Sequence, residues 1–193
     1  VFYHFRVGSS FDNDFVDNAW LMVDFFFVLS GFVMTLAYTK RLGNMSDYGV
    51  FVKKRFLRLY PLHLLVLLAF VGIELLKVAA SKYLGYTTLS EPFSGDNSVG
   101  ALTANFMLIH NLVLPNTSWN YPSWSISAEF AVYLVFATVC VVFANRTKAQ
   151  AIVFAFLMFF AFGVLQYEGM KGQMNIAGPS RCVFSFILGH FTY

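Results

Sequence analysis

Charged residues and cysteines are scarce in this sequence of 193 residues. Only 12% of the residues are Asp, Glu, Lys or Arg, against roughly 25% in an average soluble domain, which argues against a water-soluble fold of this size. The two cysteines, Cys140 and Cys182, each lie inside or beside an apolar run. They cannot build a disulfide framework or a thiolate metal cluster, and no metal site is expected.

Other features are missing as well. There is no basic tract with interleaved aromatic residues and the net charge is only +3, so nucleic acid is not expected as a partner. No charged segment followed by a small-residue cleavage site is visible, so membrane insertion must depend on the spans themselves. The sequence opens on Val1 and closes inside the apolar run 183–193. We therefore interpret both ends as truncated.

Apolar residues make up 58% of the sequence and aromatic residues 19%, including 24 Phe. This suits helices that face lipid tails and pack against one another. Four stretches approach the roughly 20 residues that cross a bilayer: Trp20–Tyr38, Leu59–Val78, Ile126–Ala144 and Ala149–Tyr167. A fifth begins near Arg181, and Phe2–Phe5 would end a sixth. The sequence predicts an all-α transmembrane bundle of about four to six membrane helices, forming a single domain over 1–193.

Basic residues crowd the loop between the first two spans: Lys40, Arg41, Lys53, Lys54, Arg55 and Arg58. The positive-inside rule places this loop, 39–58, in the cytoplasm. The short run Ala101–Leu114 has the length of a re-entrant or interfacial segment. If it does not cross, Arg146 and Lys148 also lie inside; if it crosses, Lys171 takes their place. Charge does not decide between these topologies, and length favours the first.

The residues that precede the second span predict an amphipathic helix over 47–59, with Ser46 as its N-cap and Pro61 ending it. Its apolar stripe contains Arg55, with Arg58 at the edge. One interpretation makes both arginines topology signals that reach for lipid headgroups. The other turns them toward the bundle as a site for an anionic ligand with phosphates, such as acyl-CoA.

The run Pro122–Glu129 brings a carboxylate and three hydroxyl groups into the start of a span, with Ser125 and Glu129 on one face. They either stabilise the helix start through the macrodipole and capping, or form a site. Asp24, in the first third of its span, leaves the same two alternatives. Ser30 and Gly31 are expected to let another helix approach closely.

Four ordered motifs resemble the acyltransferase-3 family of membrane O-acyltransferases. They are His4 at the end of a first helix, Phe26-Phe27-Val28-Leu29-Ser30-Gly31-Phe32, Arg55-Phe56-Leu57-Arg58-Leu59-Tyr60-Pro61 and Trp124-Ser125-Ile126-Ser127-Ala128-Glu129. Arg181 ahead of Phe186-Ile187-Leu188-Gly189 matches a weaker fifth motif. Family members have about twice as many helices, so the chain would correspond to an N-terminal half.

The resemblance implies an enzyme that transfers an acyl group, often acetyl, from acyl-CoA to a hydroxyl of a carbohydrate or other cell-envelope acceptor. It would be no aminoacyltransferase, would hold no permanent cofactor, and would lie in the inner or plasma membrane. His4 would be the general base, and Glu129 would orient it or hold the acceptor. Arg55 and Arg58 would bind acyl-CoA. The remaining positioning residues would be Asp24, Trp124, Ser125 and Arg181.

The other histidines, His63, His110 and His190, are interpreted as packed, hydrogen-bonded side chains. A membrane transporter or flippase is the alternative function, because it would also place ionisable residues in helices. Transporters commonly break their helices at the midplane. Here Pro61 and Pro122 are expected at helix starts, and the charges lie near helix ends, which favours the enzyme.

Overall fold

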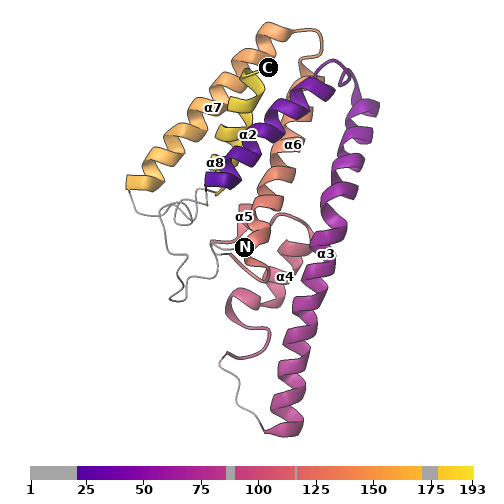
Figure 1. The fold of residues 1–193 in the computed structure, drawn as a ribbon, viewed down its shortest axis with the longest axis vertical. Helices are drawn as coiled ribbons and strands as arrows, with labels where there is room; N and C mark the ends of the chain where they lie inside the picture. Colours follow the sequence, from indigo (N-terminus) through magenta and orange to yellow (C-terminus); the bar gives the residue numbers. More distant parts are fainter. Residues whose placement is uncertain (1–20, 86–89, 116, 171–177) are drawn as a thin grey trace, which may run out of the picture.

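The computed structural model describes residues 21–85, 90–115, 117–170 and 178–193, and every regular element in these ranges is helical. The longer helices are α2 (Leu21–Tyr38), α3 (Met45–Leu84), α6 (Trp124–Val142), α7 (Thr147–Met170) and α8 (Gly178–Phe191) (Figure 1). Short elements join them: η2 (Gly95–Asn97), α4 (Val99–Phe106), α5 (His110–Val113) and η3 (Tyr121–Ser123). The predicted all-α fold is confirmed.

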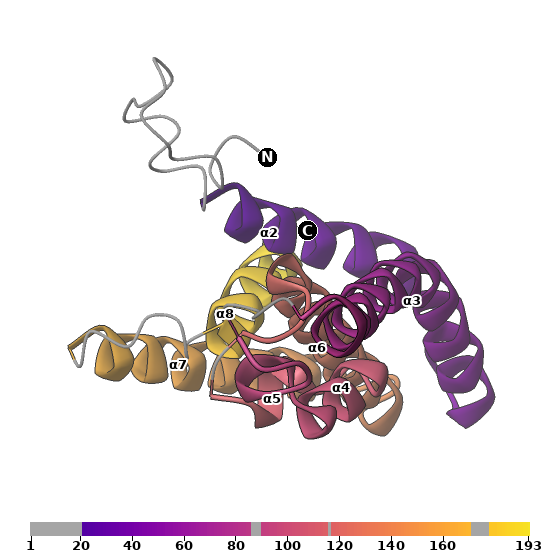
Figure 2. The same cartoon turned by 90° about the horizontal axis from the view of Figure 1, so that it is seen from below.

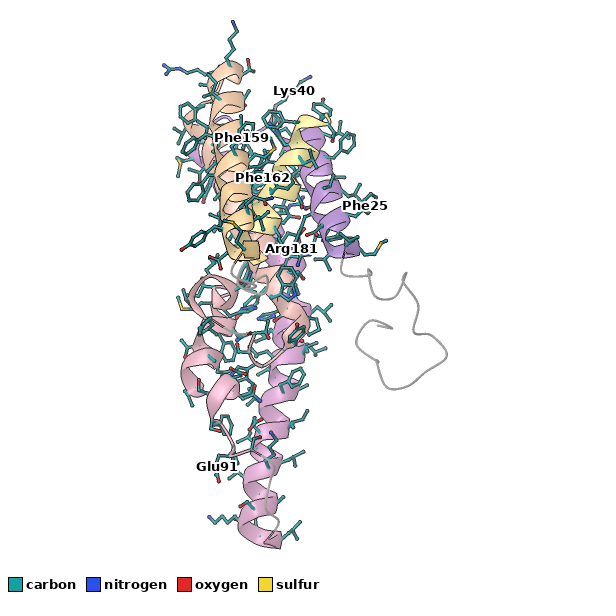
Figure 3. All side chains as sticks on the ribbon, turned by 90° about the vertical axis from the view of Figure 1, so that its left-hand side faces the viewer. Phe25, Lys40, Glu91, Phe159, Phe162 and Arg181 are labelled. Carbon is teal, nitrogen blue, oxygen red and sulfur yellow. The ribbon has the colours of Figure 1, made fainter. Side chains whose placement is uncertain are left out.

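Helices α2, α3, α6 and α7 are each long and apolar enough to cross a membrane, so the protein is a multi-pass membrane protein. They coincide with the four predicted spans to within a few residues, except that α3 is much longer. Helix α6 lies at the centre, between α3 and α8, and is the most buried of the four (Figure 2). Its Phe136 packs against Phe51, Phe154 and Phe186. Phe159 of α7 projects outward, as expected of a lipid-facing residue (Figure 3).

Helices α2 and α8 cross in backbone contact. A Cβ built on Gly31 would lie 1.9 Å from the carbonyl oxygen of Phe186, and one built on Gly189 would lie 1.9 Å from that of Val28. Neither helix has room for a side chain at the crossing, because the obstructing atoms belong to the partner's backbone. The prediction that Gly31 permits close helix packing is confirmed, and its partner is Gly189.

Helix α3 corrects two predictions. Its N-cap is Asn44, not Ser46: the Asn44 side chain accepts hydrogen bonds from the backbone N–H groups of Ser46 and Asp47. Pro61 does not end the helix, which continues through it for 40 residues in all. A proline removes one backbone hydrogen bond, and neighbouring helices in a membrane bundle tolerate this loss. Tyr60 stacks on Phe56 one turn earlier, so the ring pair reinforces the helix where the bond is missing.

The run 101–114 does not form a spanning helix. It is divided between α4 and α5, which have eight and four residues. The connection between α6 and α7 lies at the same end of the bundle as that between α2 and α3 (Figure 1). This arrangement brings the basic residues of both connections to one end, with Lys40 there and Glu91 at the opposite end (Figure 3). The structure therefore agrees with the topology that length favoured.

Glu74 anchors the segment 90–123 to the distal half of α3. Glu74 is 2% exposed, and its carboxylate accepts hydrogen bonds from Lys77 Nζ, the Phe93 backbone N–H and Asn97 Nδ2 at 2.8–3.1 Å. Asn97 Oδ1 in turn accepts from the backbone N–H of Trp119. Glu74 was not among the residues predicted from the sequence. Its role is structural, because the hydrogen bonds that its carboxylate accepts come from Lys77 and from residues of this segment.

We expect Glu74→Ala to lower the free energy of unfolding by about 1–3 kcal/mol, because the part-buried donors of Phe93 and Asn97 lose their acceptor. Thermal unfolding in mild detergent and the rate of protease cleavage in segment 90–123 would measure the effect. Glu91→Ala is the matched control: Glu91 is exposed, and its loss should change stability by less than about 0.5 kcal/mol. Equal melting temperatures for the two variants would contradict the anchoring role.

Candidate functional site

A buried polar cluster lies where α2, α3 and α6 meet. Glu129 is 4% exposed, and its Oε1 accepts hydrogen bonds from Ser30 Oγ at 2.9 Å and from Tyr133 OH in a short contact. The two hydroxyl groups also lie 2.7 Å apart. Glu129 and Tyr133 share a face of α6 because they are four residues apart. The small Ser30 side chain lets α2 come close enough to complete the cluster.

Arg55 adds a cation beside this cluster. It is 8% exposed, its Nη2 donates to Tyr38 OH at 2.8 Å, and its guanidinium carbon lies 5.8 Å from the centre of the Tyr133 ring. Its Nε and Nη1 have no hydrogen-bond partner among the described residues. A buried cation with unused donors is costly unless an anion approaches it. Arg55 is therefore the best anion-binding candidate in the described part of the chain.

A second polar cluster lies where α2 and α6 begin, farther from the basic end of the bundle. Asp24 Oδ2 accepts from Arg181 Nη2 at 2.8 Å, which ties α2 to α8. The Arg181 guanidinium lies 5.6 Å from the ring centre of Trp124, and Phe27 packs edge-on against the same ring. Both charged side chains are partly shielded from solvent, so the ion pair is stronger than a surface pair.

The two clusters follow one another along the line where side chains of α2 meet those of α6, which we call the α2–α6 seam. On α6 it runs from Trp124 through Glu129 to Tyr133, nine helical steps that span roughly 13 Å. On α2 it runs from Asp24 to Ser30. Arg55 lies beyond Tyr133, on the side of the basic end. The seam thus lines up polar groups between the two ends of an otherwise apolar bundle.

The predicted site residues are distributed unevenly over these clusters. Glu129, Arg55, Asp24, Trp124 and Arg181 all lie in the seam or beside it. The helix wheel around Arg55 is confirmed: Phe51 is buried, and the two lysines Lys53 and Lys54 are exposed on the other side of α3.

Three predicted residues lie elsewhere. Arg58 does not turn inward with Arg55, since its side chain is exposed; it is three residues farther along α3 and falls outside the stripe. Ser125 Oγ donates to the carbonyl of Pro122 at 3.2 Å, and the structure buries Ser127 in place of it. His4 lies outside the described residues.

Two site residues were not predicted from the sequence: Tyr133, which binds the Glu129 carboxylate, and Tyr38, which binds the Arg55 guanidinium. The signal for Tyr133 was its spacing of four residues from Glu129. Tyr38 carried no such signal, because its contact with Arg55 depends on how α2 and α3 pack. His63, His110 and His190 are hydrogen-bonded and at least partly buried, as predicted.

Comparison with known proteins places the chain in a family. It is 34% identical over 120 residues, 60% of its length, to "Acyltransferase MdmB" of Streptomyces mycarofaciens. It is 52% identical over 52 residues, 26% of its length, to "Protein 2 in picA locus" of Rhizobium radiobacter. Each match covers 27% of the relative's own length. No solved structure matches. The family model described as "Acyltransferase domain" matches residues 1–193, and the chain therefore belongs to the acyltransferase-3 family.

Proposed function

We propose that the full-length protein moves an acyl group from acyl-CoA to a hydroxyl of a carbohydrate or another cell-envelope molecule, within the inner or plasma membrane. The observation that carries the proposal is Arg55, a buried cation beside the basic end of the seam, whose Nε and Nη1 have no hydrogen-bond partner among the described residues. An acyl-CoA carries phosphate groups, whose oxygens a planar guanidinium binds well. Exposed Arg58, on the same helix, would add attraction for the phosphates at the surface.

The seam supports an orientation in which donor and acceptor approach from opposite ends. The positive-inside rule places the basic end, with loop 39–58, in the cytoplasm, where acyl-CoA would enter. The acceptor would then approach from the other end, where Asp24, Arg181 and Trp124 lie. Polar groups of these types, an ion pair beside an aromatic face, suit a hydroxylated ligand.

The chemistry assigns a role to each group. The acceptor oxygen attacks the thioester carbonyl, the new C–O bond forms as the C–S bond breaks, and the acceptor proton is finally delivered to the CoA sulfur. A sugar hydroxyl is too weakly acidic to attack unaided, so a base must take its proton during the attack. His4 is the proposed base. Glu129, held by Ser30 and Tyr133, would orient the imidazole and stabilise its charged form, or hold the acceptor hydroxyl.

Arg55→Ala in the full-length protein is expected to weaken acetyl-CoA binding about 10- to 100-fold, because one or two charge-assisted hydrogen bonds are lost. Isothermal titration with acetyl-CoA would measure this, and release of free CoA thiol would report turnover. Lys53→Ala is the matched control: it removes an exposed cation two residues away on the other side of α3 and should change affinity less than threefold.

His4→Ala separates binding from chemistry. It should leave acetyl-CoA affinity unchanged and remove turnover, if His4 is the base. Equal losses of donor affinity in the Arg55 and His4 variants would contradict this division of roles. Transport of a polar cargo without any thioester cleavage would favour the transporter alternative over the enzyme.

A further inference from the structure

Two buried histidines, His63 and His110, lie side by side outside the seam. His63 of α3 is 1% exposed and His110 of α5 is 4% exposed. Their rings are nearly parallel, with 3° between the planes and 5.6 Å between the centres. The proposed acyl-transfer mechanism uses neither of them. Two buried imidazoles side by side need an explanation, because most buried polar atoms are fully hydrogen-bonded.

The hydrogen-bond partners fix which nitrogen carries the proton in each neutral ring. His63 Nε2 lies 2.9 Å from the backbone carbonyl oxygen of Asn105, which can only accept. His110 Nε2 lies 3.2 Å from both the carbonyl oxygen and the Oγ of Ser123, and that hydroxyl already donates to Asn120 at 2.7 Å. Both Nε2 atoms must therefore be donors. Each neutral ring then presents Nδ1 as a bare hydrogen-bond acceptor.

No hydrogen-bond donor among the described residues reaches either Nδ1 atom. The same is true of Asn105 Oδ1. The Asn105 amide nitrogen is used, since it donates to Ala101 and Ser118 at 2.8 Å each. His63, His110 and Asn105 are thus rich in acceptors and have no spare donor of their own, while the neighbouring Asn111 Nδ2 is a buried donor without a partner. The cluster calls for a ligand that donates hydrogen bonds.

Protonation of His110 is a poor substitute for such a ligand. Burial lowers the pKa of His110 to about 4, and α5 is not one of the spanning helices. His110 is therefore a neutral acceptor near pH 7. A metal ion is also disfavoured, because the described residues bring no third His, Cys, Asp or Glu to the pair.

The histidine pair contacts the residues at the N-terminal end of α6. Ser123, which holds His110, directly precedes Trp124, the first residue of that helix. Ser127 Oγ donates to the carbonyl of Leu108 at 2.7 Å, and Leu108 has a left-handed φ of 56° that is strained for leucine. These bonds fix His110 against the end of the seam where Trp124 lies.

On its other side the cluster approaches the protein surface. Ser118, the hydrogen-bond partner of Asn105, lines a surface pocket of about 170 Å³. Its walls come from η2, α4 and the stretch after α5, and the polar residues among them are Asp96, Ser98 and Ser118. The histidine cluster therefore lies between a polar surface pocket and the entrance of α6.

We propose that His63 and His110 form a subsite that accepts hydrogen bonds from the hydroxyl groups of the acceptor substrate. This rests on the proposed function, and it names the acceptor class: a neutral, polyhydroxylated molecule. Because the subsite offers acceptors only, it repels phosphates and carboxylates, whereas Arg55 attracts them. The two ends of the protein would thus select the acceptor and the donor by opposite chemistry.

The test replaces each histidine with glutamine in the full-length protein. The glutamine amide nitrogen takes the place of Nε2–H, so His63→Gln and His110→Gln keep the bonds to Asn105 and Ser123 but remove Nδ1. Acetyl-CoA is supplied with methyl β-D-glucopyranoside as acceptor, and separately with water alone. We expect the KM for the glucoside to rise about 5- to 10-fold in each variant, the effect of one lost hydrogen bond. Thioester hydrolysis and the KM for acetyl-CoA should stay within twofold.

Each outcome decides between explanations. An unchanged glucoside KM in both variants, with hydrolysis intact, would show that the pair only packs the structure or holds water. Hydrolysis by the wild type without transfer to the glucoside would also overturn the subsite, while leaving the proposed donor chemistry standing. A wild type that neither hydrolyses acetyl-CoA nor transfers its acetyl group would overturn the proposed function itself. If one variant loses hydrolysis through misfolding, the other gives the answer alone.

Discussion

Replacing Gly31 with leucine is expected to eliminate the folded protein. The new Cβ would lie 1.9 Å from the carbonyl oxygen of Phe186, far inside van der Waals contact, and no rotamer moves a Cβ. Helix α2 would have to separate from α8, which would break the Asp24–Arg181 ion pair and draw Ser30 away from Glu129. We expect a loss above about 4 kcal/mol, a large part of the roughly 5–15 kcal/mol that stabilises a typical domain.

The yield of monodisperse protein in mild detergent and its melting temperature would measure this loss. Gly163→Leu is the matched control, because a Cβ at Gly163 of α7 meets nothing within 4 Å and leucine suits a lipid-facing position. Gly189→Leu, on the opposite side of the same crossing, should reproduce the defect. A Gly31→Leu variant as stable as Gly163→Leu would show that the crossing can open without cost.

The glycine crossing also shows how far the sequence determines the fold. Small residues at Ser30 and Gly31 predicted a close helix contact, and apolar length predicted the spans, because both are local properties of the chain. The partner, Gly189, was not predictable, since it depends on which helix packs there. The length of α3 was missed for a related reason: Pro61 is a strong local signal for a helix end, and the packing of neighbouring helices overrode it.

The candidate site was predictable to a similar extent. Arg55 was placed correctly because an arginine inside an apolar stripe is visible on a helix wheel. Arg58, at the edge of that stripe, turned out exposed, since one helical step decides on which side an edge residue lies. The histidine pair could not be predicted: His63 and His110 are 47 positions apart in the sequence, and only the folding of α5 onto α3 brings their rings together.

Glu129→Gln in the full-length protein is expected to lower kcat about 10²- to 10⁴-fold while acetyl-CoA affinity stays within threefold. The amide keeps the shape of the carboxylate and the one acceptor oxygen to which Ser30 and Tyr133 both donate. It cannot stabilise an imidazolium or hold a hydroxyl by charge, which is the role proposed for Glu129. Rates of CoA release and titration with acetyl-CoA would measure the two quantities, and the melting temperature would verify folding.

Tyr133→Phe tests the role of Glu129 by removing a hydrogen bond to its carboxylate. It removes one hydroxyl that holds the carboxylate but leaves the charge, so we expect a decrease in kcat of only about tenfold, the effect of a lost orienting hydrogen bond. The order of the two effects is the decisive result. If Glu129→Gln keeps more than a tenth of the wild-type kcat, the contacts of Glu129 with Ser30 and Tyr133 are structural, and the carboxylate has no part in the chemistry.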